Sequence, residues 1–325
     1  MTATVRSFAK INLGLRIGSA REDGFHPLLT VYQTIGLHDV IRVSVARGRG
    51  IEIRCSDPRV PLGDSNTCFR IAEKGMAALG AKGRVVIQIE KRLPVQGGLG
   101  GASANAVATL LALECALRKK LPAAKKLRIA AEVGSDLPLF LVGGTVLGVG
   151  RGEQVYPLPD FPKTTGVVIT PEIGVSTPKA FAHWDRIQKN RSKLTTSHVS
   201  DRMNELGCGL SAWLSEFYSG APSSSTERGG RAGNPLLALV RAGIENDFEQ
   251  VVFPEYPELG QAKSALVRAG AKYASLSGSG STLYGLFASR RAADLAVTRL
   301  RKAGWAAQAT STLTRAQYWR RLFGT

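Results

Sequence analysis

Apolar and polar positions alternate near the start of the chain, where positions 8–17 read FAKINLGLRI. This alternation predicts a β-strand with Lys10 and Asn12 on one face and the larger apolar side chains on the other. The run VVIQIE at 85–90 is rich in β-branched residues and predicts a second strand. Over the first 160 residues we expect strands at 8–17, 40–45, 51–54, 85–90 and 137–149, and helices at 66–79, 103–117 and 122–133.

The second half mixes short strand patterns with longer stretches of helical spacing. Here we expect strands at 167–170, 272–276, 282–287 and 305–310, and helices at 177–185, 203–218, 235–242, 257–269 and 291–303. Positions 219–234 read SGAPSSSTERGGRAGN, a composition that indicates a flexible surface insertion. The sequence therefore predicts an α+β protein of two domains, at 1–160 and 161–325.

The composition fits this picture, because 44% of the 325 residues are hydrophobic and 21% are charged, which argues against disorder. The formal net charge is +18, and a charge of this size attracts nucleic acid, anionic membranes or polyanionic small molecules. The lysines and arginines are spread along the whole chain. A generally basic surface is therefore a better interpretation than a dedicated nucleic-acid stripe.

Several classes of protein are disfavoured by what the sequence lacks. No apolar stretch is long enough for a signal peptide or a membrane helix, so we expect a cytoplasmic protein. The four cysteines and four histidines are scattered, without zinc spacing or an HExxH pattern. The cysteines are interpreted as buried small hydrophobic residues.

The glycine-rich run LPVQGGLGGASAN lies directly between a predicted strand and a predicted helix. Glycines allow close approach to a ligand, and the free amides at a helix N-terminus favour anions. The run is neither a Walker A loop nor a dinucleotide fingerprint, because the residues that those motifs require are missing. Taken alone it indicates either a polyphosphate site or a tight strand-to-helix turn.

Two further motifs are ambiguous when each is taken alone. Lys10 and Asn12 form either a pair that binds phosphate and substrate or an ordinary solvent-facing strand surface. Asp136, in GSDLPLF, follows a predicted helix end, where a carboxylate commonly makes a turn. It is equally suited to accept a proton from an alcohol, and phosphoryl transfer needs little beyond a base, positive charge and positioning.

The order of AKINLGL, GGLGGASAN, GSDLPLF and SLSGSGSTL resembles the GHMP kinases, which include galactokinase, homoserine kinase and mevalonate kinase. Within this superfamily, DGFH at 23–26 and NDFE at 246–249 resemble the family that phosphorylates the 2-hydroxyl of 4-diphosphocytidyl-2-C-methyl-D-erythritol in non-mevalonate isoprenoid biosynthesis. The resemblance covers both halves of the chain. It implies an N-terminal ATP-binding domain like ribosomal protein S5 domain 2 and a ferredoxin-like C-terminal domain, with ATP and substrate between them.

The resemblance also implies roles for individual residues. Asp136 would be the general base, and Lys10 would orient the substrate hydroxyl. ATP would be bound by Asn66, Lys91, Pro94, Val95, Gln96, Gly97, Gly98, Leu99, Gly100, Gly101, Ala102, Ser103 and Ala104, with Mg²⁺ near Ser103. The cytidine substrate would be bound by Asn12, Phe25, His26, Tyr32, Thr177 and Phe181, of which Phe25 and Phe181 would stack on the cytosine and His26 would recognise its edge.

The glycine run departs from the family pattern at three positions. Gln96 and Ala102 replace glycines, and Ala104 replaces a serine. We expect the methyl group of Ala102 to restrict positive φ and Ala104 to remove a hydroxyl contact. Altered ATP affinity with retained activity is the expected consequence.

Three alternatives to this assignment stay open at this point. They are another GHMP kinase acting on homoserine or mevalonate, a basic nucleic-acid-binding protein, and an inactive structural paralogue. The DGFH segment disfavours the first, and the presence of Lys10 and Asp136 disfavours the other two. We therefore expect a small-molecule partner, neither nucleic acid nor membrane, and a monomer or weak homodimer.

Overall fold

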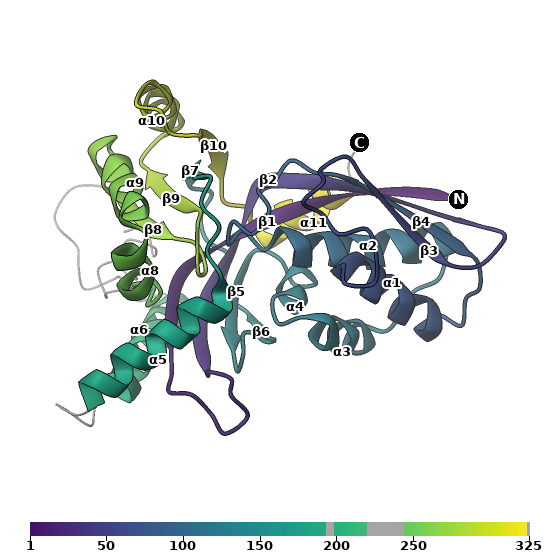
Figure 1. The fold of residues 1–325 in the computed structure, drawn as a ribbon, viewed down its shortest axis with the longest axis horizontal. Helices are drawn as coiled ribbons and strands as arrows, with labels where there is room; N and C mark the ends of the chain where they lie inside the picture. The colour runs from purple at the N-terminus through teal and green to yellow at the C-terminus, as the bar shows by residue number, and fades with distance from the viewer. Residues whose placement is uncertain (193–197, 220–243, 324–325) are drawn as a thin grey trace.

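The computed structural model describes residues 1–192, 198–219 and 244–323, which form two sheets with their helices (Figure 1). The first sheet has the strand order β3-β4-β2-β5-β6, and β1 pairs along the length of β2. Its neighbouring strands are antiparallel except for β3 and β4. The strands are β1 (Thr2–Ile17), β2 (Leu28–Ala46), β3 (Ile51–Cys55), β4 (Arg84–Glu90), β5 (Thr145–Val149) and β6 (Gln154–Pro157).

Helices cover one face of this sheet (Figure 1). They are α1 (Thr67–Ala78), α2 (Gly101–Leu117), α3 (Ala123–Val133) and the short α4 (Leu137–Phe140). Alternate residues of β4, namely Val85, Ile87 and Ile89, are buried in the same core as α2. Helix α2 is apolar around most of its circumference, which explains its central position in that core.

The second sheet is antiparallel throughout, in the order β10-β7-β9-β8. Its strands are β7 (Thr165–Ile169), β8 (Tyr273–Leu276), β9 (Leu283–Phe287) and β10 (Ala307–Ser311), and the helices of this part are α5 (Thr177–Ser192), α6 (His198–Ser219), α8 (Glu249–Glu255), α9 (Pro257–Arg268) and α10 (Arg290–Lys302). In β7, Val167 and Ile169 pack with α9 and α10, whereas Val168 faces the β1–β2 ribbon. The long ribbon therefore belongs to both halves of the molecule.

The predicted α+β class is confirmed, and most predicted elements are present. The expected strand at 137–149 is wrong in its first part, because Leu137–Phe140 forms α4 before β5 begins. Pro138 lies in the first turn of that helix, where its missing N–H costs nothing. The first parts of β1 and β2, the strand β6 and the helices α8 and α11 were not predicted. The proposed helix at 235–242 and nearly all of the insertion lie outside the described residues, and the domain boundary at 160/161 stays a prediction.

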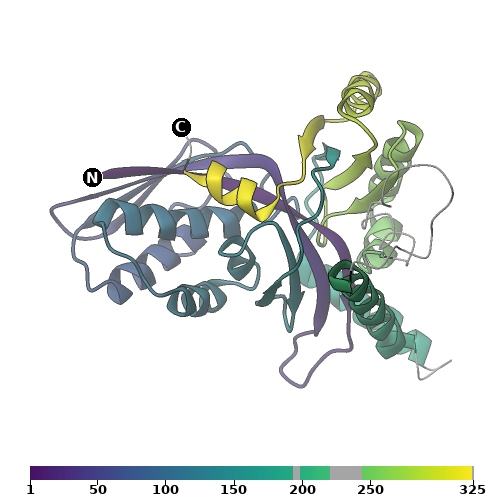
Figure 2. The same cartoon turned by 180° about the vertical axis from the view of Figure 1, so that it is seen from behind.

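Helix α11 (Arg315–Leu322) returns to the first sheet although it follows the whole second sheet in sequence (Figure 2). A capping box between Thr314 and Gln317 starts it. The buried Tyr318 donates a hydrogen bond of 2.6 Å from its hydroxyl to the carbonyl of Phe140, and the indole of Trp319 donates one of 3.0 Å to the carbonyl of Val142. The helix therefore braces the segment that contains α4.

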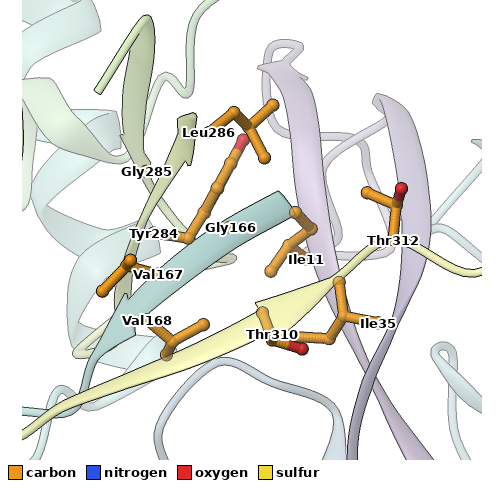
Figure 3. A pocket seen from close by; sticks show the side chains of 10 residues that line it. All are labelled: Ile11, Ile35, Gly166, Val167, Val168, Tyr284, Gly285, Leu286, Thr310 and Thr312. Carbon is orange, nitrogen blue, oxygen red and sulfur yellow. The ribbon is translucent and has the colours of Figure 1, made fainter. Parts of the chain in front are cut away.

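A small cavity of about 10 Å³ separates the β1–β2 ribbon from the second sheet (Figure 3). Its lining is apolar apart from Thr310, Thr312 and the Tyr284 hydroxyl, and its volume is near the lower limit for one water molecule. The hydroxyl of Thr310 is buried and has no hydrogen-bond partner within the described part of the chain. The cavity is a packing defect and offers no site for a cofactor.

We expect Thr310→Val to stabilise the fold by about 1 kcal/mol, because valine keeps the shape and removes an unpaired buried hydroxyl. Thr312→Val is the matched control. The Thr312 hydroxyl accepts a 2.8 Å hydrogen bond from the Thr164 amide, so this second change should destabilise by about 1–2 kcal/mol. Urea denaturation of the two variants measures both effects, and shifts of the same sign would contradict the interpretation.

Candidate active site

The glycine run leaves β4 and enters α2 through a sequence of backbone conformations that glycine adopts easily. Gly98 and Gly100 have φ of 75° and 68°, in the left-handed region, and Gly100 is the N-cap of α2. As a glycine, this N-cap residue has no side chain with which to cap the helix. The amides of the first helical turn are therefore available to an anion, as the sequence predicts.

The run rests on the turn between β8 and β9, which contains the SLSGSGSTL motif. The Thr282 amide donates a 3.1 Å hydrogen bond to the Gly97 carbonyl, and the Ser277 hydroxyl donates one of 3.0 Å to the Gly98 carbonyl. A Cβ at position 98 would lie 2.1 Å from the Ser277 carbonyl oxygen. Gly98 is thus required both by its φ angle and by this close approach between the two halves of the protein.

The structure corrects two expectations about the departures from the family pattern. Ala102 is the second residue of α2, so its methyl group restricts nothing; the residue with positive φ is Gln96, at 58°. Ala104 is 3% exposed and packs in the core, so a serine hydroxyl there would point into apolar surroundings. The conformational constraint in the loop therefore lies at Gln96.

We expect Gln96→Gly to stabilise the protein by up to about 1 kcal/mol, because the left-handed conformation costs non-glycine residues about 1–2 kcal/mol and the freer unfolded chain offsets part of that gain. Arg118→Gly is a matched control, since Arg118 has φ of 53° at the far end of α2. Thermal unfolding should show similar increases for the two variants. A loss of stability in Gln96→Gly alone would contradict this account.

Lys10 lies beside the glycine run, in the middle of β1. Its amide donates a 3.0 Å hydrogen bond to the Leu99 carbonyl, and its Nζ lies 3.7 Å from Asp136 Oδ2. Nζ also donates a 2.7 Å hydrogen bond to Asn12 Oδ1, and Asn12 Nδ2 donates one of 2.8 Å to the Thr30 hydroxyl. Both polar atoms of Asn12 are thus used within the protein. The predicted shared face of Lys10 and Asn12 is present, but it is buried and not solvent-facing.

Asp136 is the N-cap of α4, but its carboxylate makes no capping hydrogen bond. It instead accepts a 3.1 Å hydrogen bond from the Tyr32 hydroxyl, and its side chain remains 35% exposed. Burial, together with this carboxylate, raises the pKa of Tyr32 well above its ordinary value. Burial lowers the pKa of Lys10, and the Asp136 carboxylate acts in the opposite direction. A carboxylate open to solvent therefore stands between a buried cation and a neutral phenol.

Sequence reasoning missed Asp39, a carboxylate with no exposed surface at the entrance to the glycine run. Its Oδ1 accepts hydrogen bonds of 2.7 Å from the amides of Arg92 and Leu93. Its Oδ2 accepts bonds from Lys91 Nζ at 2.7 Å and Asn105 Nδ2 at 2.9 Å. Lys91, predicted to contact ATP, is thus ion-paired, and Asp39 fixes β4 relative to α2. Asp39 lies just before the strand expected at 40–45, and no local pattern marks it as a residue with such partners.

The remaining predicted ATP residue, Asn66, caps α1 by accepting a 2.8 Å hydrogen bond from the Cys68 amide. It does not line the cavity of about 240 Å³ beside the entrance to the glycine run. That cavity is lined by Lys91 and Pro94 together with residues of both halves, among them Arg59 and Thr170. It is large enough for part of a nucleotide.

Of the residues predicted to bind cytosine, His26 and Phe181 lie together at α5, whereas Phe25 contacts Arg151 instead. The His26 ring is stacked on Phe181, with centroids 4.8 Å apart and planes 16° apart. Phe25 is 49% exposed, and the Arg151 guanidinium lies 4.8 Å from the centre of its ring. Thr177, the first residue of α5, has its hydroxyl 2.7 Å from that of Ser279, in the turn that supports the glycine run.

No group of three or more histidine, cysteine, aspartate and glutamate side chains in the described ranges is placed to hold a metal ion. No helix within those ranges is long and apolar enough to cross a membrane.

Two family models match the chain, the GHMP kinases N terminal domain over residues 66–144 and the GHMP kinases C terminal domain over residues 233–305. The 4-diphosphocytidyl-2-C-methyl-D-erythritol kinase of Solibacter usitatus is 40% identical over 92% of this chain and 85% of its own length. The kinase of the same name from Acaryochloris marina is 33% identical over 92% of each chain.

Solved structures give the same picture of the fold. A crystal structure of 4-(cytidine 5'-diphospho)-2C-methyl-D-erythritol kinase matches with a TM-score of 0.68 at 27% identity, over 96% of this chain and 99% of its own. Homoserine kinase from Cytophaga hutchinsonii matches with a TM-score of 0.69 at 18% identity, over 96% and 95%. The second likeness shows a shared fold only.

Proposed function

This chain belongs to the 4-diphosphocytidyl-2-C-methyl-D-erythritol kinases of the GHMP superfamily, and from that premise we propose that it transfers the γ-phosphate of ATP to the 2-hydroxyl of 4-diphosphocytidyl-2-C-methyl-D-erythritol. This is a step of non-mevalonate isoprenoid precursor biosynthesis. The observation that carries the proposal is the meeting of Lys10, Asp136 and the open N-terminus of α2 at one place, with Lys10 Nζ 3.7 Å from Asp136 Oδ2.

Asp136 takes the proton of the substrate 2-hydroxyl as that oxygen attacks the γ-phosphorus. The bond between the γ-phosphorus and the oxygen bridging to the β-phosphate breaks, and its electron pair leaves with ADP. Lys10 holds the reacting oxygen and offsets its developing charge, while Asn12 keeps Nζ in place through their 2.7 Å hydrogen bond. General-base catalysis of this kind contributes about 10²–10⁴-fold to the rate.

The amides at the start of α2 stabilise the negative charge of the phosphates. Magnesium in kinases is held largely by phosphate oxygens and water together with a few protein oxygens, and the Ser103 hydroxyl in the first turn of α2 would be the protein group beside such an ion. When bound, the ion neutralises charge on the β- and γ-phosphates. The adenosine part of ATP occupies the cavity of about 240 Å³ beside Lys91 and Pro94, which adjoins the glycine run.

The test is a coupled assay of ADP release with a panel of alcohols. The cytidine diphosphate substrate should be turned over, and homoserine and mevalonate should give rates near background. Preference for either of these two alcohols would overturn the substrate assignment and leave the kinase assignment in place. If none of the alcohols in the panel supports ADP release, the proposed function is overturned.

A further inference from the structure

The imidazole of His26 is held by two side chains of α5 that lie one helical turn apart. Phe181 stacks on the ring, and Asp185 Oδ1 lies 2.8 Å from its Nε2. Residues four apart lie on the same face of a helix, so the two contacts come from one surface of α5. Phe181 itself packs edge-on against Phe248, with ring centroids 5.0 Å apart. The His26 ring is thus fixed in both plane and rotation.

The contact with Asp185 decides which nitrogen of His26 is protonated. An ionised carboxylate only accepts hydrogen bonds, so the 2.8 Å contact requires a proton on Nε2. In the neutral ring Nδ1 then carries a lone pair and is an acceptor. The described residues supply no hydrogen-bond partner for Nδ1.

We infer that Asp185 is a positioning residue that sets the specificity for the base of the substrate, an inference that rests on the proposed function. With Nε2 protonated, Nδ1 of His26 accepts a hydrogen bond from the exocyclic amino group of cytosine. Uracil presents a carbonyl oxygen at that place, and two facing acceptors leave both groups unpaired. A site built around one hydrogen-bond polarity discriminates strongly against the opposite one.

The discriminating variant is Asp185→Asn, which has nearly the same size and retains a hydrogen bond to the ring. An amide accepts from a protonated Nε2 or donates to an unprotonated one, so the preference for one tautomer is lost. We expect the ratio of kcat/KM for cytidine over uridine diphosphate methylerythritol to fall about tenfold. The fall should come through KM of these substrates, with KM for ATP unchanged. Glu255→Gln is the matched control, because Glu255 lies 3.5 Å from Nδ1 of another histidine, His183, which belongs to α5 and not to the proposed base site.

A second readout does not depend on activity. Nitrogen-15 NMR of the imidazole side chains, with His26→Gln used for assignment, should show Nε2 protonated and Nδ1 bare in the unchanged protein. Asp185→Asn should show a mixture of the two tautomers.

The inference is overturned if Asp185→Asn keeps the original base preference, or if kcat/KM falls by the same factor for the cytidine and the uridine substrate. It is also overturned if Nδ1 is protonated in the unchanged protein. Absence of turnover of the cytidine substrate by the unchanged protein would instead count against the proposed function, and the NMR measurement would still test the tautomer.

Discussion

Asp136→Asn should reduce kcat by about 10²–10⁴-fold while leaving the dissociation constant for ATP within about threefold of its original value. Asparagine has the same shape but cannot take a proton from the substrate hydroxyl. The Asp136 carboxylate is 35% exposed and makes no capping hydrogen bond, so its loss should leave α4 in place. Lys10 keeps its 2.7 Å hydrogen bond to Asn12, which limits the cost of the lost ion pair.

Single-turnover kinetics and calorimetric titration with ATP measure the two quantities separately. Asp294→Asn is the control, because Asp294 pairs with Arg290 on the exposed face of α10, far along the chain from the site. That variant should be indistinguishable from the original protein. Turnover of Asp136→Asn within threefold of the original would show that the base lies elsewhere.

Gly98→Ala is expected to be the most damaging substitution in the glycine run. The added Cβ would lie 2.1 Å from the Ser277 carbonyl oxygen and 2.9 Å from that of Gly280, and both are backbone atoms that cannot move independently. Overpacking costs about 1–3 kcal/mol and the left-handed conformation about 1–2 kcal/mol more. The loop should separate from the β8–β9 turn, and kcat/KM for ATP should fall about 100-fold, which corresponds to about 2.7 kcal/mol.

Gly80→Ala separates the two contributions. Gly80 also has positive φ, 56°, but a Cβ there would meet no atom within 4 Å. This control should lose about 1–2 kcal/mol of stability and keep its activity. If Gly98→Ala behaved like Gly80→Ala in both measurements, the contact between the glycine run and the turn would be irrelevant to ATP binding.

Elements with strong local periodicity could be predicted from the sequence. Helix α2 was expected from its alanine and leucine content without a breaking residue, and β4 from its β-branched alternation. The N-terminal half of β2 was missed because its polar residues look solvent-exposed in sequence. Gln33 instead donates a hydrogen bond to the Leu313 carbonyl, and Asp39 pairs with Lys91, residues far away along the chain. Local pattern carries no information about such partners.

In the candidate site, too, residues in local motifs could be predicted and residues that depend on distant partners could not. The glycine run, Lys10 and Asp136 were found because each lies in a recognisable motif, whereas the roles of Asp39 and Asp185 depend on partners that only the fold brings near. The strained residue was misplaced at Ala102 for a related reason: the start of α2 lies two residues earlier than expected, and a helical residue has negative φ. The error in the helix boundary therefore caused the error in the position assigned to positive φ.

The return of α11 to the first sheet has a consequence for how the chain is made. Tyr318 and Leu322 belong to the same core as Val5 and Phe8, so this core cannot close until about 300 further residues have left the ribosome. The N-terminal strand is therefore synthesised first, but its core is completed only when α11 has been made. During translation, the surface around Phe140 that α11 later covers stays uncovered until the residues of α11 have been made. A recombinant fragment that stops before residue 315 would keep that apolar surface exposed permanently.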